Sequence, residues 1–127
     1  MEEKLDILLE RSKSLYFHYP VAAILECYDG TLFYGVNIET SSPAAGVCAE
    51  RNALFSAISQ GYTRDDFKSI HLKAKSNKEV YPCFICRQAL VDYCKQDLEI
   101  IIYYEGKLKQ VLLHEISPFA FCDADLS

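Results

Sequence analysis

The segment VCAER at residues 47–51 is followed, 35 positions downstream, by PCFICRQ at residues 82–88. Each segment has the pattern of a first helical turn. Behind the first, apolar residues recur at helical spacing as far as Gln60, and Gly61 supplies a C-terminal stop. Behind the second, proline suits a helix start and further apolar residues extend the same face. We therefore expect two helices that each begin at a cysteine, and the rest of the fold is arranged around them.

Three thiols lie at these two helix starts: Cys48, Cys83 and Cys86. A helix N-terminus favours the thiolate form, through its macrodipole and its free N–H groups. Cys83 and Cys86 stand at i and i+3, so their side chains share one helical face. Three thiolates fill three corners of a zinc tetrahedron and leave the fourth corner open for water, as in catalytic sites. The sequence predicts one Zn²⁺ ion per chain.

Length and charge narrow the range of functions. The chain has 127 residues, of which 50% are hydrophobic and 24% charged, and we expect a single globular domain over residues 1–127. Its formal charge of −5 argues against a nucleic-acid partner, because such proteins usually carry a basic surface. A small, weakly charged ligand fits this composition better.

The six cysteines could suggest disulfides. However, the N-terminal residues lack a basic leader pattern, and no apolar run is long enough to cross a membrane or direct export. We therefore expect reduced thiols, a cytoplasmic location and no membrane partner. Cys27, Cys94 and Cys122 lie outside the metal pattern and are expected to be ordinary core residues.

The remaining elements follow from periodicity and turn residues. Apolar spacing predicts an N-terminal helix, and Asp-Gly at residues 29–30 is a strong hairpin signal. In the strand expected at 69–74, His71 alternates toward solvent, and neither it nor the other histidines is given a function. The expected elements are a helix at 3–16, strands at 21–28 and 31–37, a loop at 38–47, the helix at 49–60, the strand at 69–74, the second cysteine helix ending near Tyr93, and strands at 99–104 and 107–113.

This order of helices and strands predicts the fold class. Helices that alternate with strands after an opening hairpin favour an α/β fold, with a five-stranded mixed sheet and helices on both faces. The two cysteine helices each follow a strand, so we expect them side by side on one face. Their N-termini then meet at one edge of the sheet, the usual place for sites in open α/β folds.

Glu50 and two arginines complete the expected chemistry. A zinc ion with an open position lowers the pKa of its water to roughly 7, and a neighbouring carboxylate can carry protons to a ring nitrogen and a leaving amine. Glu50, two residues after Cys48, is the expected catalytic carboxylate for such a hydrolytic deamination. Arg51 and Arg87 are candidates to donate hydrogen bonds to the thiolates and so restore the Lewis acidity of the metal.

These residues resemble a known family. Cys-Ala-Glu at 48–50 with Pro-Cys-x-x-Cys at 82–86 is similar to the signature of zinc-dependent cytidine deaminases, specifically their short, three-cysteine, homotetrameric branch. The likeness extends to residues 16–25, to Gly-Val-Asn-Ile-Glu at 35–39 and to residues 116–121. It implies a three-layer α/β/α fold and the hydrolysis of cytidine or 2′-deoxycytidine to the uridine nucleoside and ammonia, as in pyrimidine salvage.

The resemblance also implies roles at the substrate. Asn37 and Glu39 match the pair that binds the ribose hydroxyls, and Tyr19 falls where the family places a Phe that stacks on the pyrimidine. Ala49, between a ligand and the catalytic carboxylate, is an expected substrate contact. Phe121 matches an aromatic residue that reaches a neighbouring subunit's site in a homotetramer.

Alternatives stay open at this stage. Pro43 replaces the family's Tyr, and Phe84 replaces a Gly and adds bulk near the metal, so a modified cytosine nucleoside such as a blasticidin-type antibiotic is an alternative substrate. A second alternative is a thiol–disulfide redox protein that uses Cys83 and Cys86. Each site residue also has a plain structural interpretation, as a core thiol or structural zinc ligand, a helix-start carboxylate, a surface charge, a polar strand end or a core aromatic.

Overall fold

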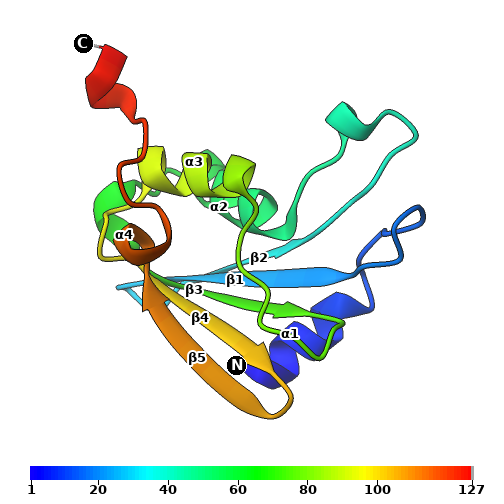
Figure 1. Cartoon of the computed structure of the whole chain (residues 1–127). Helices are drawn as coiled ribbons and strands as arrows, with labels where there is room; N and C mark the ends of the chain where they lie inside the picture. Colours follow the sequence, from blue (N-terminus) through cyan, green and yellow to red (C-terminus); the bar gives the residue numbers. More distant parts are fainter. Residues whose placement is uncertain (127) are drawn as a thin grey trace.

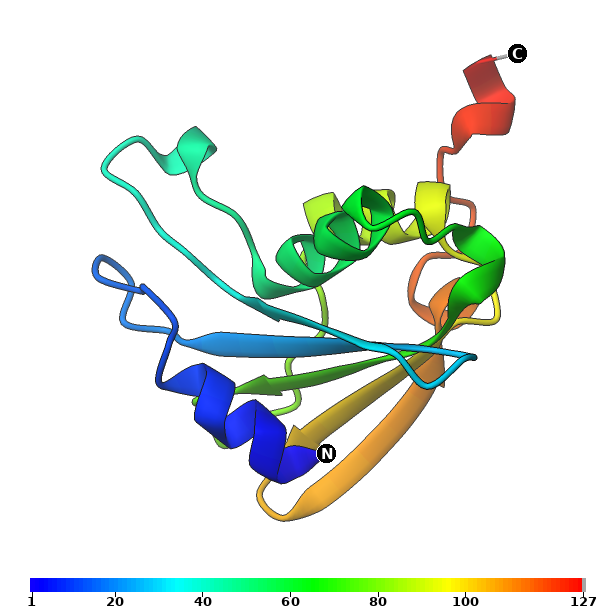
Figure 2. The same ribbon diagram turned by 180° about the vertical axis from the view of Figure 1, so that it is seen from behind.

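The computed structural model describes residues 1–126 and shows a five-stranded mixed sheet with helices on both faces (Figures 1 and 2). The strands run in the order β2-β1-β3-β4-β5. All neighbours are antiparallel except β3 and β4, which are parallel. The strands are β1 (Val21–Cys27), β2 (Leu32–Val36), β3 (Phe67–Ala74), β4 (Glu99–Tyr104) and β5 (Lys107–Leu112).

Helices cover the two faces unequally. Helices α2 and α3 lie side by side on one face, with the short α4 beside them, whereas α1 covers part of the opposite face (Figures 1 and 2). This gives the three-layer arrangement that the element order predicts. Over residues 1–126, no helix is both long and apolar enough to span a membrane. The helices are α1 (Glu2–Leu9), α2 (Ala49–Ser59), α3 (Phe84–Tyr93) and α4 (Leu113–Ile116), with 3₁₀ turns at Pro43–Ala45, Arg64–Asp66 and Asp123–Leu126.

Two hydrophobic clusters hold the layers together. The larger lies between the sheet and α2/α3 and includes Leu54, Leu90 and Ile100, while α1 buries a smaller cluster against β1. Burial of this apolar surface supplies most of the driving force for folding. Cys27 and Cys94 are buried in the larger cluster, which confirms their expected place in the core. Cys122 is only partly buried.

Gly35 allows α2 to pack closely against β2. A Cβ atom at this position would lie 2.3 Å from the Ala49 carbonyl oxygen and 2.5 Å from the Ala53 nitrogen. Both are backbone atoms and cannot rotate away. The first turn of α2, which carries Cys48 and Glu50, therefore depends on a residue without a side chain on the neighbouring strand.

The N-terminal helix is shorter than expected. It ends at Leu9 rather than at residue 16. Beyond it, the Lys13 backbone pairs with the chain after β2, through Lys13 N–H to Asn37 O (3.1 Å) and Glu39 N–H to Lys13 O (2.8 Å). The Ser12 and Ser14 hydroxyls bond to Asn37 and to the Tyr19 backbone. These contacts with distant residues replace the helical hydrogen bonds that apolar spacing alone predicts.

The expected exposure of His71 is wrong. His71 is buried on the α1 face of the sheet. Its Nε2 lies 2.9 Å from a Glu26 carboxylate oxygen, and its Nδ1 lies 2.9 Å from the Tyr103 hydroxyl. Alternation predicts exposure only where nothing covers a face, and here α1 with side chains from β1 and β4 closes over β3.

Candidate active site

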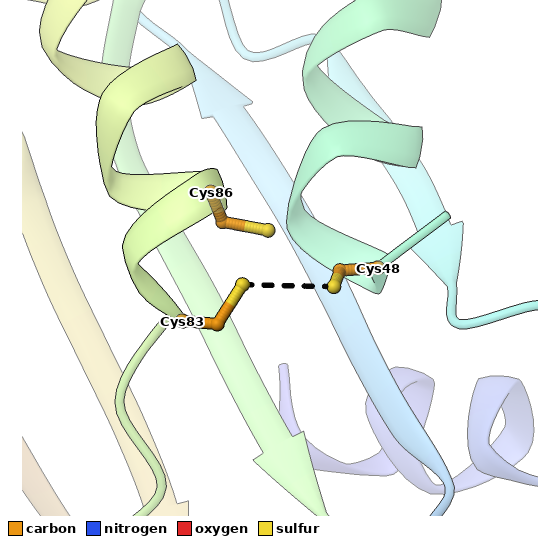
Figure 3. A group of neighbouring side chains, drawn as sticks. All are labelled: Cys48, Cys83 and Cys86. Atoms are coloured by element: carbon orange, nitrogen blue, oxygen red, sulfur yellow. Dashed lines mark hydrogen bonds between the residues drawn. The ribbon is translucent and has the colours of Figure 1, made fainter. Parts of the chain in front are cut away.

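The three predicted metal-ligating cysteines come together between the N-termini of α2 and α3 (Figure 3). Cys48 is the N-cap of α2, Cys83 is the N-cap of α3, and Cys86 lies in the first turn of α3. The three sulfur atoms lie within 4.8 Å of one another, and those of Cys48 and Cys83 are 3.8 Å apart. A disulfide would need a separation of about 2.05 Å, so the cysteines are unpaired thiols.

This cluster fits a zinc ion. Zn–S bonds of about 2.3 Å in a tetrahedron place sulfur atoms about 3.8 Å apart, which is the separation of the Cys48 and Cys83 sulfurs. Three soft sulfur donors are also a zinc-type ligand set. Three protein ligands, rather than four, leave one position of the tetrahedron for a water molecule or substrate.

Close packing of the sulfurs changes their acidity. The Cys86 thiol, followed by the Arg51 guanidinium, lowers the pKa of the Cys48 thiol, so Cys48 is a thiolate at neutral pH. The same contact with Cys48 raises the pKa of the buried Cys86 thiol, because two adjacent thiolates repel each other. A divalent cation removes this conflict, since a coordinated thiol is deprotonated outright.

Glu50 is buried beside the sulfur cluster, in the first turn of α2, and is only 6% exposed. Burial raises the pKa of Glu50 to about 7, and the negative charge of Cys48 acts in the same direction. Glu50 in turn raises the pKa of Cys86, which places its carboxyl within electrostatic reach of two of the thiols. A carboxyl group with a pKa near 7 can both accept and donate a proton at neutral pH.

The two arginines have different partners. Arg51 Nη2 lies 3.7 Å from the Cys48 sulfur, so Arg51 occupies the expected position. Arg87 does not. Its Nε donates to the Pro82 carbonyl and its Nη1 to the Ile116 carbonyl, both at 2.7 Å, and its guanidinium stacks on the Phe84 ring. The structure therefore corrects the expected thiolate contact of Arg87, because backbone oxygens at the start of α3 and the end of α4 take its donors.

A cavity of about 440 Å³ lies next to the sulfur cluster, within the usual size range of small-molecule sites. Cys48 and Arg51 form part of its wall, which joins the cavity to the thiols. The rest of the wall comes from segments 16–17 and 37–47, in the two loops that project on the same side of the molecule in Figures 1 and 2. Most of the wall is apolar, and Asn37 and Glu39 supply polar groups.

Asn37 and Glu39 also hold the cavity together. The Asn37 side-chain oxygen accepts hydrogen bonds from the Ser12 hydroxyl and the Val21 N–H, and its amide nitrogen donates to the Tyr19 carbonyl. One Glu39 oxygen accepts the N–H groups of Tyr16 (2.9 Å) and Phe17 (3.2 Å). Desolvation opposes the charge on Glu39, but these two donors outweigh it and lower the pKa of Glu39. An ionised carboxylate therefore lies in the cavity wall.

Of the other expected substrate-binding and loop residues, only Pro43 lines the cavity. Ala49 is fully buried at the start of α2. Tyr19 and Phe121 lie outside its wall, and Phe121 instead borders a groove beside α3.

Phe84 is 77% exposed on the groove side of α3. The expected bulk at the metal is therefore directed away from the cavity.

Tyr16 and Phe17 form cavity wall that the sequence did not single out. The signal available was the run of aromatic residues at 16–19, in which Tyr16 is expected to end the N-terminal helix and Phe17 lies between the expected elements. Their placement depends on Glu39, whose carboxylate holds their backbone N–H groups, and this contact spans more than 20 residues of sequence.

Comparisons with known proteins agree with this geometry. The family model described as "Cytidine and deoxycytidylate deaminase zinc-binding region" matches residues 3–102. A cytidine deaminase of Sporosarcina psychrophila is 34% identical over 88% of this chain and 82% of its own length. A blasticidin-S deaminase of Bacillus cereus is 31% identical over 94% of this chain and 85% of its own length.

Solved structures point the same way. The crystal structure of a cytidine deaminase from Burkholderia pseudomallei superposes with a TM-score of 0.88 and 32% identity, covering 94% of each chain. The sequence and the fold of this chain thus both match proteins of one family. The chain belongs to the cytidine and deoxycytidylate deaminase zinc-binding family.

Proposed function

We propose that this protein is a cytidine deaminase that hydrolyses the exocyclic amine of cytidine or 2′-deoxycytidine and releases uridine or 2′-deoxyuridine and ammonia. The observation that carries the proposal is the position of Glu50, buried beside three zinc-type thiols, of which Cys48 lines a cavity of about 440 Å³. The activity of the Sporosarcina and Burkholderia relatives, as their names give it, supports the same reaction.

Glu50 is the proton carrier in this proposal. The zinc ion would supply a water molecule of lowered pKa, roughly 7, as the source of the nucleophile. Glu50 takes one proton from that water and delivers it to the ring nitrogen next to the amine-bearing carbon. The hydroxide that remains forms a bond to the amine-bearing carbon. Glu50 then takes the proton of this new carbon-bound hydroxyl and passes it to the amine, and the carbon–nitrogen bond breaks to release ammonia. A pKa of about 7 suits both transfers, because the same group must be a base and then an acid.

The cavity supplies the contacts to the nucleoside. Glu39 accepts a ribose hydroxyl with the oxygen that does not hold the loop, and Asn37 fixes the loop around the ribose. The family resemblance assigns a base contact to Ala49, which is fully buried and could make it only through its backbone. It assigns stacking to Tyr19, whose ring would have to turn into the cavity from outside its wall. Arg51 partly neutralises the thiolates through Cys48.

The reaction is tested by ultraviolet absorbance. Adding cytidine or 2′-deoxycytidine to the zinc-loaded protein should lower the absorbance as the uridine nucleoside forms, and no change with either would refute the substrate assignment. Glu50→Ala should retain zinc but lose at least about 10²-fold in turnover, the usual share of a general acid–base. Glu10→Ala, at the exposed end of α1, is the matched control.

Two observations favour a second substrate class. The similarity to a blasticidin-S deaminase covers 94% of this chain, and Pro43 stands in the cavity wall. A panel of cytidine, 2′-deoxycytidine and blasticidin S compared by kcat/KM decides between them, and a higher value for the antibiotic would replace the nucleoside assignment. A thiol–disulfide activity of Cys83 and Cys86 is tested by metal analysis, since one tight zinc per chain excludes redox cycling of these thiols.

Self-association as a homotetramer is part of the proposal. A groove of about 470 Å³ between α3 and the chain after α4 is lined largely by apolar side chains, including Phe84, Val91 and Phe121. Exposed aromatic residues of this kind are typical of interfaces. In such an assembly Phe121 would reach the site of a neighbouring copy. Analytical ultracentrifugation tests the state, and Phe84→Ser should shift it toward smaller species.

The cellular setting follows from the chemistry. Zinc binding needs reduced thiols, and all six cysteines are free. This supports a location in the reducing cytoplasm, where a nucleoside deaminase acts in pyrimidine salvage. Growth on cytidine as the sole pyrimidine source, in cells that lack their own deaminase, tests that role.

A further inference from the structure

The segment between β3 and α3 presents one of the three zinc ligands. It leaves β3 at Ala74 and ends at Cys83, the N-cap of α3 (Figures 1 and 3). Two backbone hydrogen bonds hold its beginning, from Lys75 N–H to Pro20 O and from Ser76 N–H to Ala74 O. Within the described part of the chain, residues 77–81 are attached to the sheet through side chains rather than through backbone hydrogen bonds.

Glu79 makes that attachment. One of its oxygens accepts the Tyr81 hydroxyl at 2.7 Å, and the other accepts the Tyr104 hydroxyl at 2.9 Å. The first oxygen also lies 3.4 Å from Lys109 Nζ. Tyr104 ends β4 and Lys109 lies on β5, so the Glu79 carboxylate joins the segment to two neighbouring strands. The Tyr81 hydroxyl, followed by that of Tyr104, lowers the pKa of Glu79, which is therefore ionised at neutral pH.

The rings of the two tyrosines give this attachment stiffness. Tyr81 and Tyr104 both pack against the main hydrophobic cluster, so their hydroxyls occupy defined positions at its edge. Hydrogen bonds to a charged acceptor are stronger than those between neutral groups. Tyr81 stands two residues before Cys83, and the residue between them, Pro82, is a proline of restricted backbone freedom.

On the other side of Cys83 the chain is fixed from α3. Arg87 Nε holds the Pro82 carbonyl at 2.7 Å, and the Arg87 N–H donates to the Cys83 carbonyl at 2.9 Å. Cys86 is fixed within the helix itself. Cys83, as the N-cap, is therefore held from α3 on one side and joined through Pro82 to the preceding segment on the other, and its sulfur lies 3.8 Å from that of Cys48.

We propose that Glu79 is a positioning residue of the zinc site, which holds the segment before Cys83 on β4 and β5 and thereby keeps the Cys83 sulfur in ligand geometry. Glu79 does not line the cavity, so it acts through Tyr81 and Tyr104 rather than on the substrate. The inference rests on the zinc site of the proposed function but is independent of which nucleoside is deaminated.

The test compares two neighbouring tyrosines of β4. Tyr104→Phe removes the hydroxyl that binds Glu79, whereas Tyr103→Phe removes one that binds His71 on the opposite face of the same strand. Both variants keep their rings and lose one hydrogen bond. The measurement is the rate at which zinc passes from the purified protein to a coloured chelator, together with the thermal midpoint and amide exchange of residues 76–83.

Tyr104→Phe and Glu79→Ala should release zinc about tenfold faster than the parent protein. This is at the low end of the effects that follow the loss of residues that orient metal ligands. Amide exchange should rise within 76–83. The zinc release rate of Tyr103→Phe should stay within twofold of that of the parent protein, although the thermal midpoint of this variant falls. Equal zinc release from Tyr103→Phe and Tyr104→Phe, or unchanged release from Tyr104→Phe, would overturn the proposal and leave Glu79 a purely structural role. Because Tyr104→Phe keeps the ring in the core, the comparison stands even if Glu79→Ala fails to fold.

Discussion

Replacing Gly35 on β2 with alanine should displace the first turn of α2 and so reduce zinc binding and turnover. The new Cβ would lie 2.3 Å from the Ala49 carbonyl oxygen, and real Cβ contacts are essentially never below 3.0 Å. The first turn of α2 must then move by at least about 0.7 Å away from β2, an outward shift of the turn that carries Cys48 and Glu50. Overpacking of this kind costs about 1–3 kcal/mol of unfolding free energy. A misplacement near 1 Å costs on the order of 10²-fold in rate.

The assay separates loss of stability from loss of geometry. Gly30→Ala is the control, because Gly30 has a φ of +88° and a Cβ atom added there would meet no atom within 4 Å beyond its two chain neighbours. It should lose about 1–2 kcal/mol through backbone strain alone. Both variants are measured by urea denaturation, zinc content and turnover per folded molecule. Gly30→Ala should keep its zinc and its turnover, whereas Gly35→Ala should lose both. If Gly35→Ala kept turnover within twofold of the parent, the close contact would not position the site.

Three further predictions concern the polar contacts. Arg51→Ala should weaken zinc binding about tenfold in chelator competition, because the Cys48 thiolate loses its cationic partner. Glu26→Gln should cost about 1.5–3 kcal/mol at pH 7. His71 lowers the pKa of Glu26 below its ordinary 4.5, so this stabilisation is complete above pH 4.5 and disappears as the pH falls through the lowered value. Asn37→Ala should cost about 2–4 kcal/mol, at about 1 kcal/mol for each hydrogen bond lost, and raise KM as the loop loosens.

Each of these variants has a matched control. Arg64→Ala removes an arginine that pairs weakly with Asp123 and should leave zinc affinity unchanged. Glu10→Gln changes an exposed glutamate and is the reference variant for Glu26→Gln, with its unfolding free energy measured at pH 7. Asn52→Ala loses one hydrogen bond, to the Val36 carbonyl, and should cost less than half as much as Asn37→Ala. If Asn52→Ala lowered the unfolding free energy as much as Asn37→Ala does, the free energy would not scale with the number of hydrogen bonds lost.

The metal ligands could be predicted from the sequence because they lie in helix starts that are specified by neighbouring residues. Cys48 and Cys83 are N-caps, and the residues after each follow a helical pattern that needs no distant partner. The Asp-Gly hairpin was predictable for the same reason, because Gly30 adopts the positive φ that the turn requires. The order of elements then limits the sheet to few topologies, so two helix starts at one edge were expected before any contact was known.

Side chains with distant partners were not predictable. Ser12 and Ser14 look like helical positions until Asn37 and the Tyr19 backbone take up their hydroxyls. His71 follows strand alternation, but the covering α1 layer and Glu26 determine its burial. Arg87 stands next to a zinc ligand in sequence, yet it extends along α3 to a carbonyl 29 residues away. In each case tertiary contacts override the periodic pattern.

The ligand cluster and the proton carrier are electrostatically one unit. The Cys48 charge raises the pKa of Glu50, and Glu50 raises that of Cys86, so neither group can be tuned alone. The helix starts and Arg51 stabilise the thiolates, while Glu50 is buried with little compensation. The asymmetry lowers the pKa of the Cys48 thiol and raises that of the Glu50 carboxyl to about 7. A substitution that weakens the thiolates must therefore also change the acidity of Glu50, even when it touches neither the carboxyl nor the substrate.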